Sequence, residues 1–108
     1  MGKEPTLLWD PSEQRKSNAN LTRYLDWLVE NKGVQYDSYQ SLWDWSVTDL
    51  DGFWGSLWDF FEVIFHKPYD QVLAGRQMPG ARWFTNSTLN YAEHSLRRRD
   101  EHIAIVFQ

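Results

Sequence analysis

The stretch DLDGFWGSLWDFFEVIF, residues 49–65, carries the clearest structural pattern in this sequence. Its apolar residues recur every three or four positions, which is the spacing of one face of an α-helix. Asp49 is a favourable N-cap, and Asp51 places a second carboxylate in the first turn, where it complements the helix dipole. Pro68 ends the helix, because the residue before a proline is pushed out of the helical region. The pattern predicts the central helix of the core, with these residues on its inner face: Leu50, Phe53, Trp54, Leu57, Trp58, Phe61, Ile64 and Phe65.

Two shorter helices are predicted before this one. The first can be capped by Ser17 or Asn18 and stops at Asn31 and Gly33. The second begins at the N-cap Ser38 and ends before Val47. Their inward-facing residues are expected to be Leu21, Tyr24, Leu25 and Leu28 in the first helix, and Tyr39, Leu42 and Trp43 in the second.

The sequence after Pro68 is less regular. Residues 70–74 are expected to add one helical turn, and Gly75, Pro79 and Gly80 then mark turns. A last helix is predicted from Asn86 or Ser87, with Leu89, Ala92 and Leu96 facing inward and Arg97, Arg98 and Arg99 in its final turn.

The end of the sequence predicts a single buried strand. Residues 103–107, IAIVF, form a β-branched apolar run, and no second strand is evident elsewhere. A lone buried strand needs neighbours for its backbone groups, so we expect the sequence to stop within a larger fold. The predicted fold class is therefore mainly α, with one C-terminal strand whose partners lie elsewhere.

Composition narrows the function classes. The 108 residues include seven Trp, five Tyr and six Phe, and each such ring can bury about 150–250 Å². Cysteine is absent, which removes disulfides and thiolate chemistry and fits a reducing compartment. A net charge of -4 argues against non-specific nucleic-acid binding. The start shows neither a signal peptide nor a membrane span, so we expect a soluble cytoplasmic protein.

Few residues are candidates for chemistry. Glu62 and His66 are spaced i, i+4 with Asp59 one turn earlier, but a solvated polar face is a better interpretation than a metal site. His94 and His102 have no residues beside them in the sequence that would form a catalytic group with them. The basic residues 97–99 are interpreted as favourable charges at the C-terminal end of the helix dipole. The Asn-X-Thr patterns at Asn20 and Asn86 match the N-glycosylation acceptor, but they are interpreted as residues at the starts of helices. The glycines do not have the spacing of a phosphate-binding loop. We predict no catalytic, cofactor-binding or metal-binding residue.

The tryptophans allow two interpretations, because aromatic clusters form binding surfaces as well as cores. Trp54 and Trp58 share a helical stripe and are predicted to lie in the core. Trp9, Trp27 and Trp45 are placed less clearly, and any of them could be exposed at an interface.

The sequence also resembles a known family. PGARWF at 79–84, followed by LNYAE at 89–93, resembles the amino-terminal region of acetyl- and acetoacetyl-CoA synthetases. LWDPS at 8–12, residues 39–42, WSV at 45–47, FW at 53–54 and LWDFF at 57–61 agree in order and spacing with the acetoacetate branch. The NYAE form after Trp83 and Phe84 is the main reason for preferring that branch.

The resemblance implies a parent enzyme that forms an adenylate. Such an enzyme activates a carboxylate with ATP and Mg²⁺, releases pyrophosphate and passes the acyl group to CoA. The family's catalytic motifs lie downstream of this region, so no catalytic residue is carried over. The resemblance also implies the domain organisation: residues 1–101 would form a small helical N-terminal cap, and residues 102–108 would contain the first strand of the large domain, Ile103 to Phe107. The implied partner is that large domain of the same polypeptide. In this chain alone we expect that strand to be frayed or paired with another chain, and exposed apolar faces to favour self-association.

Two functional hypotheses follow, from different classes. The first is a catalytically silent N-terminal segment of an acetoacetyl-CoA synthetase. The alternative is a freestanding interaction module that binds a peptide or helix through exposed tryptophans. An independent small enzyme is the least favoured, because no group of residues meets the geometric requirements of an active site.

Overall fold

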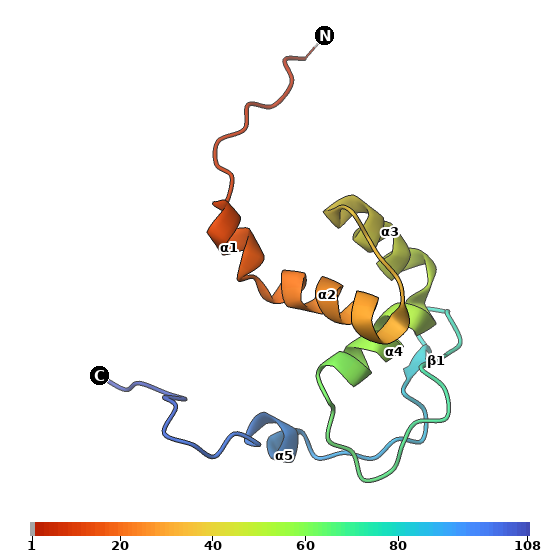
Figure 1. The fold of residues 1–108 in the computed structure, drawn as a ribbon. Coiled ribbons are helices and arrows are strands. Elements are labelled where there is room, and N and C mark those ends of the chain that lie inside the picture. Colours follow the sequence, from red (N-terminus) through yellow and green to blue (C-terminus); the bar gives the residue numbers. More distant parts are fainter. Residues whose placement is uncertain (1) are drawn as a thin grey trace. The chain divides into compact units, whose positions relative to one another are not determined.

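The computed structural model describes residues 2–108, and Met1 lies outside the described residues. The structure is mainly helical, with one small antiparallel sheet (Figure 1). It divides into two compact units, one ending at Leu42 and one running from Trp43 to Gln108. The elements, in chain order, are α1 Glu13–Ser17, α2 Asn20–Lys32, α3 Tyr39–Thr48, α4 Leu50–Phe60, β1 Leu73–Ala74, β2 Arg82–Trp83 and α5 Tyr91–Ser95.

The first unit is built around α2. The predicted cap at Ser17 or Asn18 is wrong, because these residues close α1, which Ser12 caps by accepting a hydrogen bond from the Arg15 backbone amide. Helix α2 starts after Ala19 without a side-chain cap. Its predicted end is confirmed: Gly33 has φ +66°, a left-handed conformation that glycine adopts at little cost.

Two further features complete this unit. Lys16 contacts Asp10 and Glu13, and these hydrogen bonds raise the pKa of the Lys16 ammonium above its usual value. The interior of the unit consists of three residues that the sequence predicts to face inward: Tyr24 and Leu28 on α2, and Leu42 on α3. Leu21 and Tyr39 were also expected to face inward, but both are exposed.

Helices α3 and α4 begin as predicted. The Ser38 hydroxyl accepts from the Ser41 amide at 3.1 Å, which caps α3. Asp49 caps α4, and its Oδ1 accepts from the Gly52 amide at 3.0 Å. The second carboxylate oxygen of Asp49 accepts from the Trp45 indole N–H at 3.2 Å. A Cβ on Gly52 would collide with this carboxylate, so the missing side chain at Gly52 leaves room for the cap.

Helix α4 ends earlier than predicted, at Phe60 instead of continuing to Pro68. Glu62 has φ +47°, and the backbone then closes on itself as a Schellman motif. In this motif the Val63 amide donates to the Trp58 carbonyl at 3.2 Å, and the Glu62 amide donates to the Asp59 carbonyl at 3.0 Å. These bonds satisfy carbonyls that the end of a helix leaves free. Ile64 and Phe65 therefore lie beyond the helix.

The sheet corrects two predictions. Residues 70–74 form no helical turn, because Leu73 and Ala74 pair with Trp83 and Arg82 as antiparallel strands β1 and β2. The expectation that no second strand exists is therefore wrong as well. Pairing continues beyond the strands, since the Phe84 amide donates to the Val72 carbonyl at 2.7 Å. A further bridge joins Lys67 to Thr88.

The C-terminal part differs most from expectation. Helix α5 is capped by Asn90, and the predicted start at Asn86 or Ser87 is wrong, since Asn86 has φ +62° and lies in the preceding loop. Leu89 and Leu96 are exposed, although both were expected to face inward. Residues 97–99 follow the helix, and residues 102–108 form no helix or strand.

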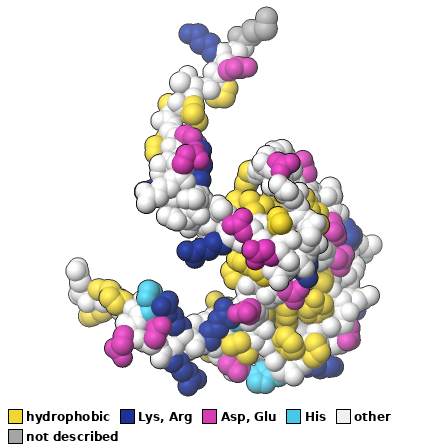
Figure 2. Space-filling model, viewed as in Figure 1, with side chains coloured by type: hydrophobic (Ala, Val, Ile, Leu, Met, Phe, Trp, Pro, Cys, Tyr) yellow, Lys and Arg dark blue, Asp and Glu magenta, His cyan; other side chains and the backbone are white. Residues whose placement is uncertain are grey.

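The apolar run at residues 103–107 is exposed, and Figure 2 shows hydrophobic side chains at the surface near this end of the chain. The buried strand predicted there is therefore absent from this structure. The assignment of this run to the sheet of a larger domain, with a boundary after residue 101, remains a prediction.

The cap of α4 allows a direct test. We expect Asp49→Ala to lower the free energy of unfolding by about 1–2 kcal/mol, because both the Gly52 amide and the Trp45 indole lose their acceptor. Asp49→Asn keeps an oxygen for the amide and is the matched control, with a smaller expected loss. Denaturant unfolding measures both. Equal losses for the two variants would contradict the capping role.

Candidate functional site

An aromatic cluster packs around Trp58, which is 9 % exposed. Its ring centroid lies 4.7 Å from Phe84, 5.1 Å from Tyr69 and 5.7 Å from Phe65. These rings come from α4, from the loop after it and from the residue that follows β2, so the cluster joins the helix to the sheet. Close approach is helped by Gly55, where a Cβ would lie 3.3 Å from the Val72 side chain. The prediction that Trp58 lies in the core is confirmed.

Trp54 lies one turn earlier, and its prediction as a core residue is wrong. Its side chain is 40 % exposed, and its ring makes edge contacts with Trp83 and Phe53, both at 5.4 Å between centroids. Trp83 is also exposed. Helical periodicity correctly places Trp54 and Trp58 on one stripe, but the short sheet covers the two rings unequally.

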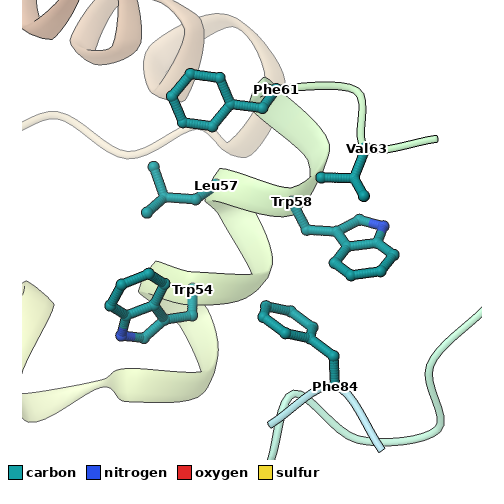
Figure 3. A pocket seen from close by; sticks show the side chains of 6 residues that line it. All are labelled: Trp54, Leu57, Trp58, Phe61, Val63 and Phe84. Carbon is teal, nitrogen blue, oxygen red and sulfur yellow. The ribbon is translucent and has the colours of Figure 1, made fainter. Parts of the chain in front are cut away.

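Two shallow depressions lie beside these rings. One of about 360 Å³ is lined by Trp54, Trp83 and Phe84. The other, of about 200 Å³, is shown in Figure 3, where Trp54 and Leu57 project from α4, Phe61 follows directly after the helix, and Phe84 approaches from a separate segment. The depressions share Trp54 and Phe84, so they form a continuous surface. We call it the aromatic surface, lined by Trp54, Leu57, Trp58, Phe61, Val63, Trp83 and Phe84.

The aromatic surface is suited to packing and offers no reacting group. Its lining side chains are apolar or aromatic, with the indole N–H groups as their only polar atoms. None can act as a nucleophile or a general base at neutral pH. The other tryptophans take varied positions: Trp9 is exposed, Trp27 stacks on Tyr24, and Trp45 donates to Asp49.

Polar contacts gather where the end of α4 meets α5. His66 Nε2 lies 2.6 Å from Glu93 Oε2. The Ile64 amide donates to His94 Nδ1 at 3.3 Å. The Arg97 guanidinium donates to the carbonyls of Phe61 and Glu62, both at 3.0 Å. We call this set of contacts the α4–α5 clasp, made by Phe61, Glu62, Ile64, His66, Glu93, His94 and Arg97.

The clasp was not predicted from the sequence. His66 was weighed as a partner of Glu62, but its partner is Glu93, 27 residues away. No local spacing signals a contact at that separation. The basic residues 97–99 also differ in their contacts. Arg97 donates to backbone carbonyls, and Arg98 forms an ion pair with Asp100 at 2.8 Å. The hydrogen bond from Arg98 lowers the pKa of the Asp100 carboxyl below its usual value.

A metal site needs several His, Cys, Asp or Glu side chains in one place. Within residues 2–108 no three His, Cys, Asp or Glu side chains come together as a possible metal site, so Asp59, Glu62 and His66 do not form one. The same residues contain no buried side-chain nitrogen or oxygen without a hydrogen-bond partner that a ligand would satisfy. No helix in this part of the chain has the length and apolar character needed to cross a membrane.

Comparison with known proteins identifies the family. Residues 39–95 match the family described as the acetyl-coenzyme A synthetase N-terminus. The chain belongs to this family. The matched range contains α3, α4, the sheet and α5, and therefore the whole aromatic surface together with the His66–Glu93 and Ile64–His94 contacts.

Relatives in this family are much longer. The acetoacetyl-CoA synthetase of Streptomyces lividans superposes with a TM-score of 0.79 and 47% identity, covering 86% of this chain and 15% of that one. The acetoacetyl-coenzyme A synthetase of Rhizobium meliloti is 30% identical over 94% of this chain and 16% of its own length. The malonamoyl-CoA synthetase of Penicillium aethiopicum is also 30% identical, over 93% of this chain and 15% of its own. The chain thus spans about one sixth of the relatives it matches, and its resemblance to the N-terminal region of acetoacetyl-CoA synthetases is confirmed.

Proposed function

We propose that this chain is the N-terminal structural segment of an acetoacetyl-CoA synthetase. The observation that carries the proposal is the superposition on the Streptomyces lividans enzyme, which combines 47% identity with 86% coverage of this chain. The complete enzyme would convert acetoacetate, ATP and CoA into acetoacetyl-CoA, AMP and pyrophosphate in the cytoplasm. The segment itself would be catalytically silent, because the residues that bind ATP, Mg²⁺ and CoA would lie in the remainder of the polypeptide.

The structural role would rest on apolar packing. The aromatic surface and the exposed run Ile103 to Phe107 leave large hydrophobic side chains uncovered. Contiguous exposed apolar surface is uncommon on monomeric soluble proteins and marks sites of association. In the complete enzyme, residues 103–107 would become the first strand of the large domain's sheet, which would satisfy their backbone groups.

The proposed acyl substrate rests on the structural match and on one sequence motif. Relatives named for acetoacetyl-CoA and for malonamoyl-CoA are each 30% identical to this chain, so overall identity alone does not separate these substrates. The structural match and the NYAE form at residues 90–93 favour acetoacetate.

A pyrophosphate-release assay on the complete polypeptide tests the substrate. We expect kcat/KM for acetoacetate to exceed that for acetate by at least about tenfold, because a pocket shaped for the longer acid loses contacts with the shorter one. The 108-residue chain is the matched control and should release no pyrophosphate with either acid. A higher rate with acetate would reassign the branch, and adenylate formation by the short chain would overturn its silent role.

The alternative is a freestanding interaction module. The exposure of Trp54 and Trp83 favours it, since tryptophans are common anchors at protein interfaces. The coding sequence separates the two hypotheses. A reading frame that continues into a Ser/Thr/Gly-rich loop supports the synthetase segment, and a natural stop codon after Gln108 supports the module.

A further inference from the structure

One contact of the α4–α5 clasp depends on a protonation state. The Ile64 backbone N–H donates to His94 Nδ1 at 3.3 Å, in a partly buried position. An imidazole nitrogen accepts a hydrogen bond only when it carries no proton. The contact therefore requires a neutral His94 with its hydrogen on Nε2, while a doubly protonated ring would turn a donor toward the amide.

The rest of the clasp responds differently to acid. His66 Nε2 and Glu93 Oε2 are 2.6 Å apart, and protonation of His66 would add charge to that hydrogen bond. The Arg97 contacts with two carbonyls do not titrate, because a guanidinium stays charged in proteins. The clasp thus combines one contact broken by protonation with others that persist.

We propose that His94 is a proton-sensitive latch, which in its neutral form holds α5 against the end of α4 and on protonation releases the Ile64 amide. Helix α5 has five residues, so tertiary contacts must hold it in place. The amide that the latch holds follows directly after the Schellman motif at the end of α4. Release frees the backbone there while Arg97 and the His66–Glu93 pair keep the segments tethered.

The sign follows from the role of His94 Nδ1 as a hydrogen-bond acceptor, which a proton on that nitrogen would abolish. Histidine is the side chain whose ordinary charge change falls between pH 5 and 8, so the latch is closed at the upper end of that range and open at the lower end. The titratable and charged groups of the two segments that meet here are Glu62, His66 and Lys67 on one side and Glu93 and Arg97 on the other.

Amide hydrogen exchange at Ile64, read by NMR in the full chain, tests the latch. We expect the protection factor, corrected for intrinsic exchange, to fall about fivefold between about pH 7.5 and pH 5, which is the loss of one ordinary hydrogen bond. His94→Asn is the matched variant, because its side-chain oxygen can replace Nδ1 as acceptor and does not titrate. Its Ile64 protection should remain constant across this range.

A second variant and a second measurement complete the test. His66→Gln retains an N–H donor for Glu93, and it should show the same fall as the unmodified chain. Loss of the fall in that variant would assign the sensor to His66 and overturn the proposal. Constant protection in the unmodified chain, no protection at either pH, or a fall that persists in His94→Asn would overturn it as well. The nitrogen chemical shifts of the His94 ring report its tautomer in the unmodified chain. The neutral ring must carry its proton on Nε2, and the Nδ1–H tautomer would exclude the latch.

Discussion

Replacing Trp58 by alanine should lower the free energy of unfolding of the second unit by about 3–5 kcal/mol. The indole is the ring on which three others converge, with centroids 4.7–5.7 Å away, and it is 9 % exposed. Its removal leaves a cavity between α4 and the segments that carry Tyr69 and Phe84. Domains are stable by only about 5–15 kcal/mol, so this single change should consume a large part of the unit's stability.

Trp54→Ala is the matched control, because it removes the same side chain from the same helix one turn away. With its ring 40 % exposed, we expect a loss of about 1–2 kcal/mol. Denaturant unfolding followed by far-UV circular dichroism compares the two without relying on tryptophan fluorescence. Equal losses would show that the Trp58 cluster is not the centre of this unit.

The contrast between the start and the end of α4 shows what the sequence could predict. Asp49 was identifiable because a cap is a local device, in which one side chain reaches an amide three residues ahead. The end was missed because the left-handed residue is Glu62, whereas such positions are usually occupied by glycine. The Arg97 contacts that surround this turn come from 35 residues away and leave no local signal.

The sheet was missed for a related reason. Strands β1 and β2 have two residues each, too few for an alternating pattern to be visible. Their pairing depends on register between segments about ten residues apart, which are joined by turns at Gly75 and Gly80 with positive φ. The glycines were correctly interpreted as turn residues, but a turn signal alone does not identify the strands that it connects.

Periodicity predicted the apolar stripe of α4 but not its burial. Trp58 is covered by rings from the loop and the sheet, whereas Trp54 and Phe61 on the same stripe remain exposed. An amphipathic pattern shows which face must be covered, and only tertiary structure shows what covers it. The His66–Glu93 contact and the contact between Trp54 and Trp83 were missed for the same reason, since each joins residues distant in sequence.

The second large effect is expected in the first unit, at Leu28. This side chain is 0 % exposed on α2, so Leu28→Ala should cost about 2–5 kcal/mol through lost burial and the cavity left behind. Amide protection within α2, together with thermal unfolding, measures the loss where it arises.

Leu21→Ala separates burial from helix propensity. Leu21 lies on the same helix but is 42 % exposed, and the substitution removes the same atoms. Alanine is the best helix former, so any gain in propensity is shared by both variants. We therefore expect Leu21→Ala to change stability by less than about 1 kcal/mol. A comparable loss for the two variants would mean that Leu28 is no more important to this unit than a half-exposed residue, and that the buried face of α2 does not hold the unit together.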